Sequence, residues 1–314
     1  MTSEDQTALN RIAAALERLA PEPPAPVDLE THAAYRWDGR HLSAIPDFQP
    51  LDYALLTGID AQKEACLENT RRLAQGYAAH DILLWGARGT GKSATVAACI
   101  GAVQKEGLSL ALVEVATDDL RSLATLFGLL RDTRRPIVLY IDDLGFDGDF
   151  GADARALRSL LQGGAASRGS NIRLYATSNR RHIVPRSMSE QDDPLHIRDV
   201  VDDRLALADR FGLSLGFHAL DQDTYVAMVK RYAARYDLAV DPAAAIQWAT
   251  QRGSRSGRVA WQYIVELAGR AGRALDDAAP QSPASAAAAP SEGVSDSRGS
   301  TGAPSPASRP LPRL

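Results

Sequence analysis

The sequence predicts an α/β fold: a P-loop parallel sheet flanked by helices and followed by a small all-helical lid. Three observations favour it. Apolar runs of strand length alternate with helical patterns through the middle of the chain, a glycine-rich loop follows one apolar run, and two adjacent aspartates end another. Such alternation is typical of a parallel sheet covered on both faces. The expected strands are residues 81–85, 109–115, 137–142, 172–177 and 213–218.

Helical periodicity fills the intervals between these runs and continues after the last of them. Asp241 is a plausible N-cap for the second helix of the final group, and Pro242 suits its first turn. The helices expected between strands are residues 92–105, 118–131 and 152–161, and those after the last strand are residues 222–236, 242–251 and 258–274. We expect the last three to form a lid.

The two ends of the chain differ in composition from its middle. Residues 1–26 combine an amphipathic helical pattern with a Pro-rich tether, which indicates a detached helix that docks on a partner, a neighbouring subunit or its own body. Residues 276–314 contain few large apolar side chains, so we expect them to be disordered. Between the ends we expect an α/β core at 27–219 and the lid at 220–275.

Composition narrows the class of protein. The 314 residues are 45% hydrophobic, enough for a substantial core, and the formal net charge of −4 provides no overall attraction to nucleic acid. We identify no signal peptide and no run of membrane-spanning length. The two cysteines, Cys66 and Cys99, fall in helical patterns, which favours small buried hydrophobes in a reducing cytoplasm and gives no support to a zinc site.

The glycine-rich loop has the spacing of a P-loop and directly follows an apolar strand. Glycines let the backbone curl around a polyphosphate so that N–H groups point at its oxygens, and the following helix dipole also favours an anion. Lys92 adds a positive charge, and the Ser93 hydroxyl is suited to Mg²⁺. We therefore predict that ATP and Mg²⁺ bind here. The predicted contacts are Gly86, Ala87, Arg88, Gly89, Thr90, Gly91, Lys92, Ser93 and Ala94.

Asp142 and Asp143 end the unbroken apolar run that starts at Ile137. Adjacent carboxylates at the end of a buried strand are costly unless something compensates their charge, and a metal ion is one such compensation. A helix cap or a solvated turn is the alternative. Because the P-loop supplies a phosphate site nearby in the same fold, we predict that Asp142 faces Mg²⁺.

With these motifs in this order, the chain resembles the AAA+ P-loop ATPases over roughly Leu51 to Ala274. It looks most like a bacterial ATP-binding family catalogued as a domain of unknown function, with distant likeness to helicase-loader and initiator modules. The resemblance implies a five-stranded core of order 5-1-4-3-2, a helical lid and ATP between them. It also implies that Asp142 reaches Mg²⁺ and that Asp143 stands where most relatives have a glutamate that polarises the attacking water.

The resemblance implies further site residues after the fourth and before the fifth strand. Asn179 matches sensor 1, which orients water beside the γ-phosphate, and Thr177 is a weaker candidate for that place. Arg210 is our choice for an arginine finger that enters the site of the next subunit, with Arg204 as the alternative. A surface arginine paired with a neighbouring aspartate is the simpler interpretation of Arg210.

Two remaining matches concern the lid and the base of the nucleotide. Arg258, at the head of the last lid helix, resembles sensor 2, with Arg255 as the alternative. Gly58 and Ile59 resemble the turn that faces adenine, although an ordinary strand-to-helix turn would look the same.

We therefore expect a Mg²⁺-dependent ATPase that remodels or loads an unknown client, working as a homo-oligomer. The alternative is an ATP-gated adaptor with little hydrolysis, which Asp143 favours because aspartate is one methylene shorter than glutamate. A small-molecule kinase or an inactive scaffold is less consistent with these motifs. A GTPase is disfavoured because this chain lacks the Asn-Lys-x-Asp tetrad that recognises guanine. Arg180, Arg181 and Arg186 form a basic patch that suits a nucleic-acid backbone or a solvated loop.

Overall fold

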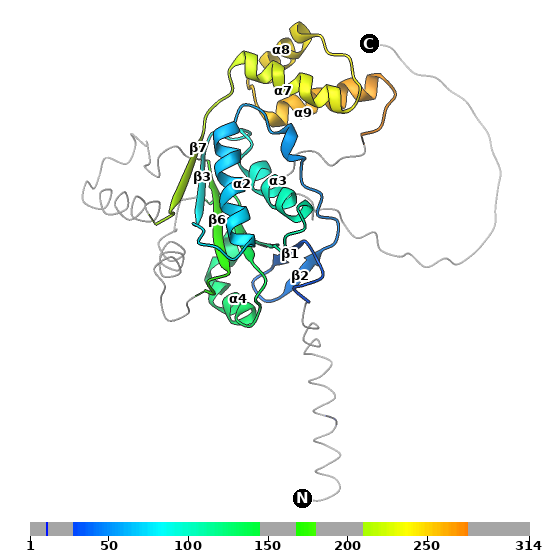
Figure 1. The fold of residues 1–314 in the computed structure, drawn as a ribbon. Helices are drawn as coiled ribbons and strands as arrows, with labels where there is room; N and C mark the ends of the chain where they lie inside the picture. Colours follow the sequence, from blue (N-terminus) through cyan, green and yellow to red (C-terminus); the bar gives the residue numbers. More distant parts are fainter. Residues whose placement is uncertain (1–10, 12–27, 145–167, 180–209, 276–314) are drawn as a thin grey trace, which may run out of the picture.

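The computed structural model describes residues 11, 28–144, 168–179 and 210–275. These residues contain a seven-stranded sheet of order β2-β1-β4-β5-β6-β3-β7 (Figure 1). The β1–β2 pair is antiparallel, and the other neighbouring strands pair in parallel. The strands are β1 (Ala34–Trp37), β2 (Leu42–Ile45), β3 (Ile82–Gly86), β4 (Ala111–Val115), β5 (Ile137–Ile141), β6 (Ile172–Ser178) and β7 (Leu213–Phe217).

The α/β P-loop fold class is confirmed. Numbered from the strand before the glycine-rich loop, β7-β3-β6-β5-β4 gives the expected order 5-1-4-3-2. Strands β1 and β2 were not predicted, and they lengthen the sheet beyond β4. Each has only four residues and no clear periodicity, so pairing of β1 with β4, and of β2 with β1, rather than local sequence makes them strands. The helix expected at 152–161 lies outside the described residues.

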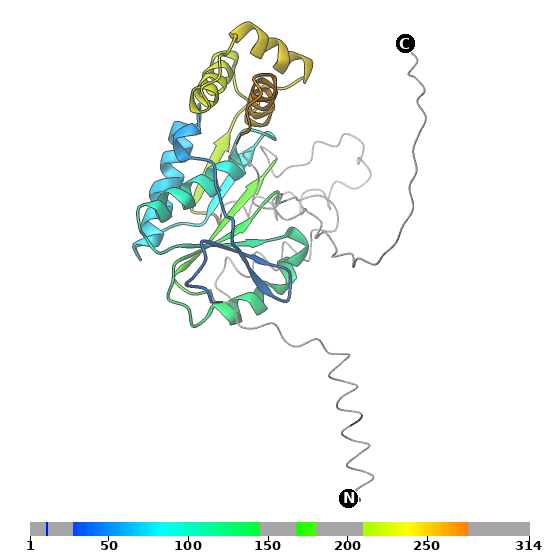
Figure 2. The same ribbon diagram turned by 90° about the vertical axis from the view of Figure 1, so that its right-hand side faces the viewer.

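Helices cover both faces of the sheet (Figures 1 and 2). Alternate residues of each strand point to opposite faces, so Ile82 and Leu84 pack with α2 (Asp60–Ala74) and α3 (Lys92–Lys105). On the other face, Leu83 belongs to the cluster that includes α4 (Leu123–Leu130). Burial on both faces is the physical reason for the continuous apolar runs in the sequence.

The helix expected at 118–131 is divided in the structure. A 3₁₀ helix, η2 (Thr117–Ser122), comes first and α4 follows it. The Ser122 hydroxyl donates to the Asp119 carbonyl three residues earlier, at 2.6 Å, and accepts from Trp37 Nε1 at 2.6 Å. The tighter turn thus satisfies a side chain of the unpredicted strand β1.

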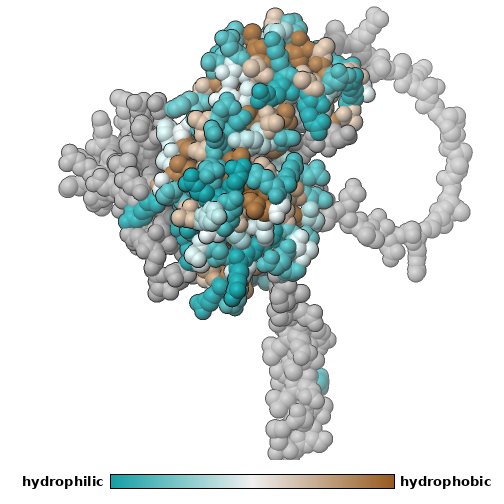
Figure 3. Space-filling view, viewed as in Figure 1, coloured by the Kyte–Doolittle hydropathy of each residue, from teal (hydrophilic) through white to brown (hydrophobic). Residues whose placement is uncertain are grey.

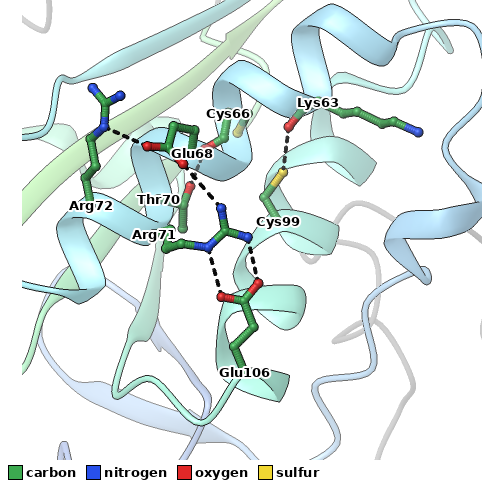
Figure 4. A network of polar contacts seen from close by, with 8 residues as sticks. All are labelled: Lys63, Cys66, Glu68, Thr70, Arg71, Arg72, Cys99 and Glu106. Atoms are coloured by element: carbon green, nitrogen blue, oxygen red, sulfur yellow. Dashed lines mark hydrogen bonds and ion pairs between the residues drawn. The ribbon is translucent and has the colours of Figure 1, made fainter.

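Polar contacts close the outer seam between α2 and α3 (Figure 4). Arg71 donates to both carboxylate oxygens of Glu106, at 2.9 and 2.7 Å, and also contacts Glu68. Beneath this seam Cys66 and Cys99 are fully buried free thiols, as expected. The outward face in this region is mainly hydrophilic in the space-filling view (Figure 3).

Three helices after β7 pack around their own hydrophobic cluster: α7 (Gln222–Arg235), α8 (Pro242–Gln251) and α9 (Gly257–Arg270). Asp241 caps α8 as predicted, because its carboxylate accepts from the Ala243 backbone N–H at 2.9 Å. Figure 1 shows these helices beyond the end of the sheet where β3 leads into α3. None of the helices in the described ranges is long and apolar enough to cross a membrane.

Candidate functional site

The glycine-rich loop joins β3 to α3 at the carboxyl edge of the sheet. Gly86 has a φ of +140°, and a Cβ there would lie 1.9 Å from the Phe217 carbonyl oxygen of β7. Gly91 has a φ of +99° and is the N-cap of α3. Glycine at Gly86 therefore serves strand packing, while glycine at Gly91 allows the left-handed turn from the loop into the helix.

Lys92 is only 5% exposed, and its ammonium group lies inside the loop. Its Nζ donates to the carbonyls of Gly86 and Ala87, at 2.9 and 2.8 Å, and to Asn179 Oδ1 at 3.0 Å. Burial lowers the pKa of Lys92 to about 8, although Asp142 and Asp143 favour its charged form. The Lys92 ammonium group is thus bonded to neutral oxygen acceptors, which another oxygen acceptor can replace.

Asp142 collects three hydroxyl donors on a single carboxylate oxygen. Ser93, Tyr140 and Thr177 lie 2.7, 2.7 and 2.6 Å from its Oδ1. Burial is the main cause that raises the pKa of Tyr140 well above its ordinary value, and the nearby Asp142 carboxylate adds to it. The predicted proximity of Ser93 and Asp142 is therefore present in the structure, and the two polar side chains face one point.

Asp143 has an unusual backbone for a residue with a side chain, with a φ of +53°. Its N–H donates to Thr177 Oγ1 at 2.8 Å, so Thr177 fixes both aspartates. The Asp143 Oδ1 accepts from Asn179 Nδ2, and its Oδ2 lies 3.5 Å from Arg88 Nη2. Asn179 consequently bridges Lys92 and Asp143. The Thr177 hydroxyl contacts the two aspartates, whereas Asn179 also contacts Lys92 of the loop.

These groups line one cavity of about 300 Å³. Its lid side is formed by Met228, Tyr232, Gly257 and Arg258, and the Gly257 N–H donates to the Gly89 carbonyl at 3.0 Å. Both Arg255 and Arg258 are exposed, but only Arg258 is among the residues that line the cavity. The lining residues are Leu51, Leu56, Thr57, Ile59, Arg88 to Ala94, Asp142, Asp143, Thr177, Asn179, Met228, Tyr232, Gly257 and Arg258.

Three of the predicted contact residues do not line the cavity. Gly86 and Ala87 instead present their carbonyls to Lys92. Gly58 has a φ of +77°, and a Cβ there would lie 2.2 Å from Thr224 Cγ2 of α7. Gly58 thus permits close approach of the lid, while its neighbour Ile59 lines the cavity.

Several lining or supporting residues were not predicted. Leu51, Leu56, Met228 and Tyr232 give the cavity an apolar side, but each reads as an ordinary core residue in the sequence. Tyr140 was recognised only as part of a buried strand, although its position two residues before Asp142 puts both side chains on one face. That spacing is the one signal available for its hydroxyl.

The unpredicted strand β1 also reaches the neighbourhood of Asp142. Arg36 Nη2 lies 3.0 Å from Glu114 Oε2 of β4, and both residues line a second cavity with Asp142. Burial raises the pKa of Glu114 despite the opposing effect of Arg36. Glu114 Oε1 has no hydrogen-bond partner within the described part of the chain.

Arg210 lies on the opposite edge of the sheet from the loop. It precedes β7, whose first residue, Leu213, pairs with Ile82 at the start of β3, whereas the loop follows the other end of β3. Arg210 is not among the residues that line the cavity of its own chain, so its role as a finger between subunits stays a prediction. Arg204 and the basic patch Arg180, Arg181 and Arg186 lie outside the described residues.

The oxygen ligands that Ser93 and Asp142 offer fit a Mg²⁺ ion that binds together with a polyphosphate. The described residues contain no group of three or more His, Cys, Asp or Glu side chains suited to a metal ion. Ser93 and Asp142 supply only two oxygen donors at one point. Mg²⁺ in phosphate-binding proteins commonly takes one or two protein oxygens and completes its octahedron with phosphate oxygens and water.

Comparison with known proteins gives a family and distant likenesses of fold. The family described as "Protein of unknown function (DUF815)" matches residues 30–271. No curated protein matches the chain. The RuvB Holliday junction branch migration motor of Thermotoga maritima is 17% identical, with a TM-score of 0.46 over 72% of this chain and 68% of that one.

Two solved structures from Aeropyrum pernix are similar to the same extent. The ORC2 protein, in its ADPNP-ADP complexes, is 14% identical, with a TM-score of 0.45 over 71% of this chain and 68% of that one. The ORC1 protein in complex with DNA is 14% identical, with a TM-score of 0.48 over 70% of this chain and 65% of that one. With the family match extending over β1 to α9, the chain belongs to the family described as "Protein of unknown function (DUF815)".

Proposed function

We propose that this protein is an AAA+ ATPase that binds ATP with Mg²⁺ between the glycine-rich loop and the lid and hydrolyses it. One observation carries the proposal: Lys92, Ser93, Asp142, Asp143 and Asn179 converge on a single cavity, with Ser93 Oγ 2.7 Å from Asp142 Oδ1. Their arrangement joins a phosphate cradle to a pair of carboxylates. The apolar residues on the lid side give the same cavity a surface suited to a nucleobase.

Each residue has a task in this proposal. Lys92 exchanges its loop carbonyls for phosphate oxygens, and Ser93 with Asp142 holds the metal. Magnesium, when bound, neutralises negative charge on the transferred phosphoryl group. Asp143 accepts a hydrogen bond from the attacking water, while Asn179 keeps that carboxylate in position.

The proposal is tested by nucleotide titration of the full chain and its Lys92→Ala variant with Mg²⁺ present. We expect Lys92→Ala to weaken ATP binding at least about 100-fold, because a phosphate loses a buried charged donor. The matched control is Lys105→Ala, which removes an exposed lysine at the other end of the same helix. Equal ATP affinity in the wild type and Lys92→Ala would refute the phosphate cradle.

A second candidate function is an ATP-gated adaptor with little hydrolysis of its own. The observation that favours it is Asp143, whose two carboxylate oxygens already contact Asn179 and Arg88. Phosphate release distinguishes the two functions when it is measured for the protein alone and with single-stranded DNA, duplex DNA, RNA or cell extract. Stimulation by one of these clients indicates a motor or loader, whereas tight binding with no release under any condition indicates the adaptor.

We also propose that the protein works as a homo-oligomer in which Arg210 enters the site of the next subunit. Lys92→Ala and Arg210→Ala proteins would each be inactive alone. Mixed oligomers would regain part of the activity, because some interfaces then combine an intact loop with an intact arginine. Absence of recovery in demonstrated mixed oligomers would exclude Arg210 as the finger.

A further inference from the structure

Arg88 is a charged residue within the glycine-rich loop itself. It lines the same cavity as Lys92, and its Nη2 lies 3.5 Å from Asp143 Oδ2. The Arg88 side chain is 80% exposed and that of Asp143 is 54% exposed. Ion pairs with this much solvent contact are weak. Arg88 can therefore leave Asp143 for a stronger acceptor at little cost in free energy.

Asp143 is restrained from both sides in this arrangement. Asn179 Nδ2 donates to its Oδ1, Arg88 approaches its Oδ2, and the backbone is held at a φ of +53° by the bond to Thr177. A carboxylate acts on a water molecule through an oxygen that faces that water. Asn179 on Oδ1 and Arg88 beside Oδ2 leave fewer of the carboxylate's lone pairs open to an attacking water.

The terminal phosphate of a triphosphate is the acceptor best placed to take Arg88 from Asp143. In a P-loop the lysine and the metal face the β- and γ-phosphates, and here Asp143 and Asn179 lie beside the Lys92 ammonium group. A group 3.5 Å from Asp143 is thus close to the outer phosphate. Guanidinium pairs with phosphate oxygens in a planar, two-bond geometry that a single exposed carboxylate contact does not provide.

We propose that Arg88 senses the γ-phosphate: it pairs with Asp143 when that phosphate is absent and moves to the phosphate when a triphosphate binds, which frees Asp143 to position water. This inference rests on the proposed function and adds regulation to the same site. It makes Arg88 a residue that distinguishes ATP from ADP. It also makes Asp143 available only in the subunit that holds a triphosphate.

The first test compares the affinities of ADP and a non-hydrolysable ATP analogue, both with Mg²⁺. We expect Arg88→Ala to weaken analogue binding about ten-fold while ADP binding changes less than about two-fold. Arg88→Lys should recover part of the difference because it retains the charge without the fork. The control is Arg72→Ala, which removes an exposed arginine of α2 that does not line the cavity.

The second test is a double-mutant cycle with Asp143→Ala, measured by analogue binding. If Asp143 competes with the phosphate for Arg88, Asp143→Ala tightens binding more when Arg88 is present than in the Arg88→Ala background. The expected difference is about three-fold, as for a weak exposed ion pair. The cycle cancels the general gain from removing a negative charge near phosphate.

The outcomes are separable. Equal effects of Arg88→Ala on ADP and analogue binding, no effect on either, or a cycle without coupling would each overturn the role of Arg88 while leaving ATP binding intact. Absence of ATP binding by the wild-type chain would instead overturn the proposed function, and this inference with it. Arg88→Gln, which removes the charge but keeps a polar side chain at this exposed position, shows whether a loss comes from misfolding of the Ala variant.

Discussion

The hydroxyl of Thr177 offers a direct test of the arrangement at the acidic end of β5. Thr177 is 1% exposed, donates to Asp142 Oδ1 at 2.6 Å and accepts from the Asp143 N–H at 2.8 Å. Valine has nearly the same shape and removes both bonds. Loss of a hydrogen bond to a charged group costs about 1.5–3 kcal/mol, and an unpaired, partly buried N–H adds about 1–2 kcal/mol. We expect Thr177→Val to lower the free energy of unfolding by about 3–4 kcal/mol.

Thr177→Ser is the matched control because it keeps the hydroxyl and removes only a methyl group, at a cost of about 1 kcal/mol. The measurement is urea unfolding of the full chain at pH 7, followed by tryptophan fluorescence, for the wild type and both variants. The valine variant should be less stable than the serine variant by about 2–3 kcal/mol. If the valine variant proves as stable as the serine variant, the hydroxyl does not hold the two aspartates and the site geometry is wrong.

Three further predictions follow from individual contacts. Gly86→Ala should lower the free energy of unfolding in urea by about 3–5 kcal/mol, because its Cβ would clash with β7. Gly76→Ala, also at a positive φ but with open space around it, should cost only about 1–2 kcal/mol. Equal costs for the two variants would exclude the clash. ATP affinity should fall as pH rises through about 8, by at most about ten-fold per pH unit, because Lys92 then loses its proton. Calorimetry in buffers of different ionisation enthalpy should detect proton uptake when ATP binds above that pH. An ATP affinity that stays constant from pH 7 to 9 would contradict the lowered pKa of Lys92. Glu106→Gln should cost about 0.5–1 kcal/mol by removing the exposed pair with Arg71, and the difference from wild type should vanish in about 1 M salt.

The core of the fold was predictable because its signals are local. The strand that ends in Asp142 is continuous and apolar because both of its faces are buried, and α8 begins where Asp241 and Pro242 provide a cap and a first turn. Strands β1 and β2 gave no comparable signal. Their four residues each become strands because β4 offers an edge on which β1 pairs, and β2 then pairs with β1; that edge comes from a distant part of the chain.

The candidate site divides in the same way. The loop from Gly86 to Ser93 was recognisable because a phosphate cradle requires glycines, a lysine and a hydroxyl at fixed spacing. The roles within it were not: Gly86 lies against β7, and Gly58 against α7, for reasons of close packing that no local pattern reveals. Likewise, Arg88 was expected to contact nucleotide simply as part of the loop, and its pairing with Asp143 depends on how β5 and β3 are spaced in the sheet.

By itself, the sequence determined the α/β class, the five strands from β3 to β7, and the chemistry available at the carboxyl edge of the sheet. Those features follow from residue periodicity and from motifs in which all the atoms come from neighbouring residues. Only the tertiary structure decided that three hydroxyls meet on Asp142, that Asn179 bridges Lys92 and Asp143, and that Arg258 rather than Arg255 lines the cavity. These contacts join strands and helices far apart in sequence, and their geometry is fixed by sheet register and packing rather than by any local preference.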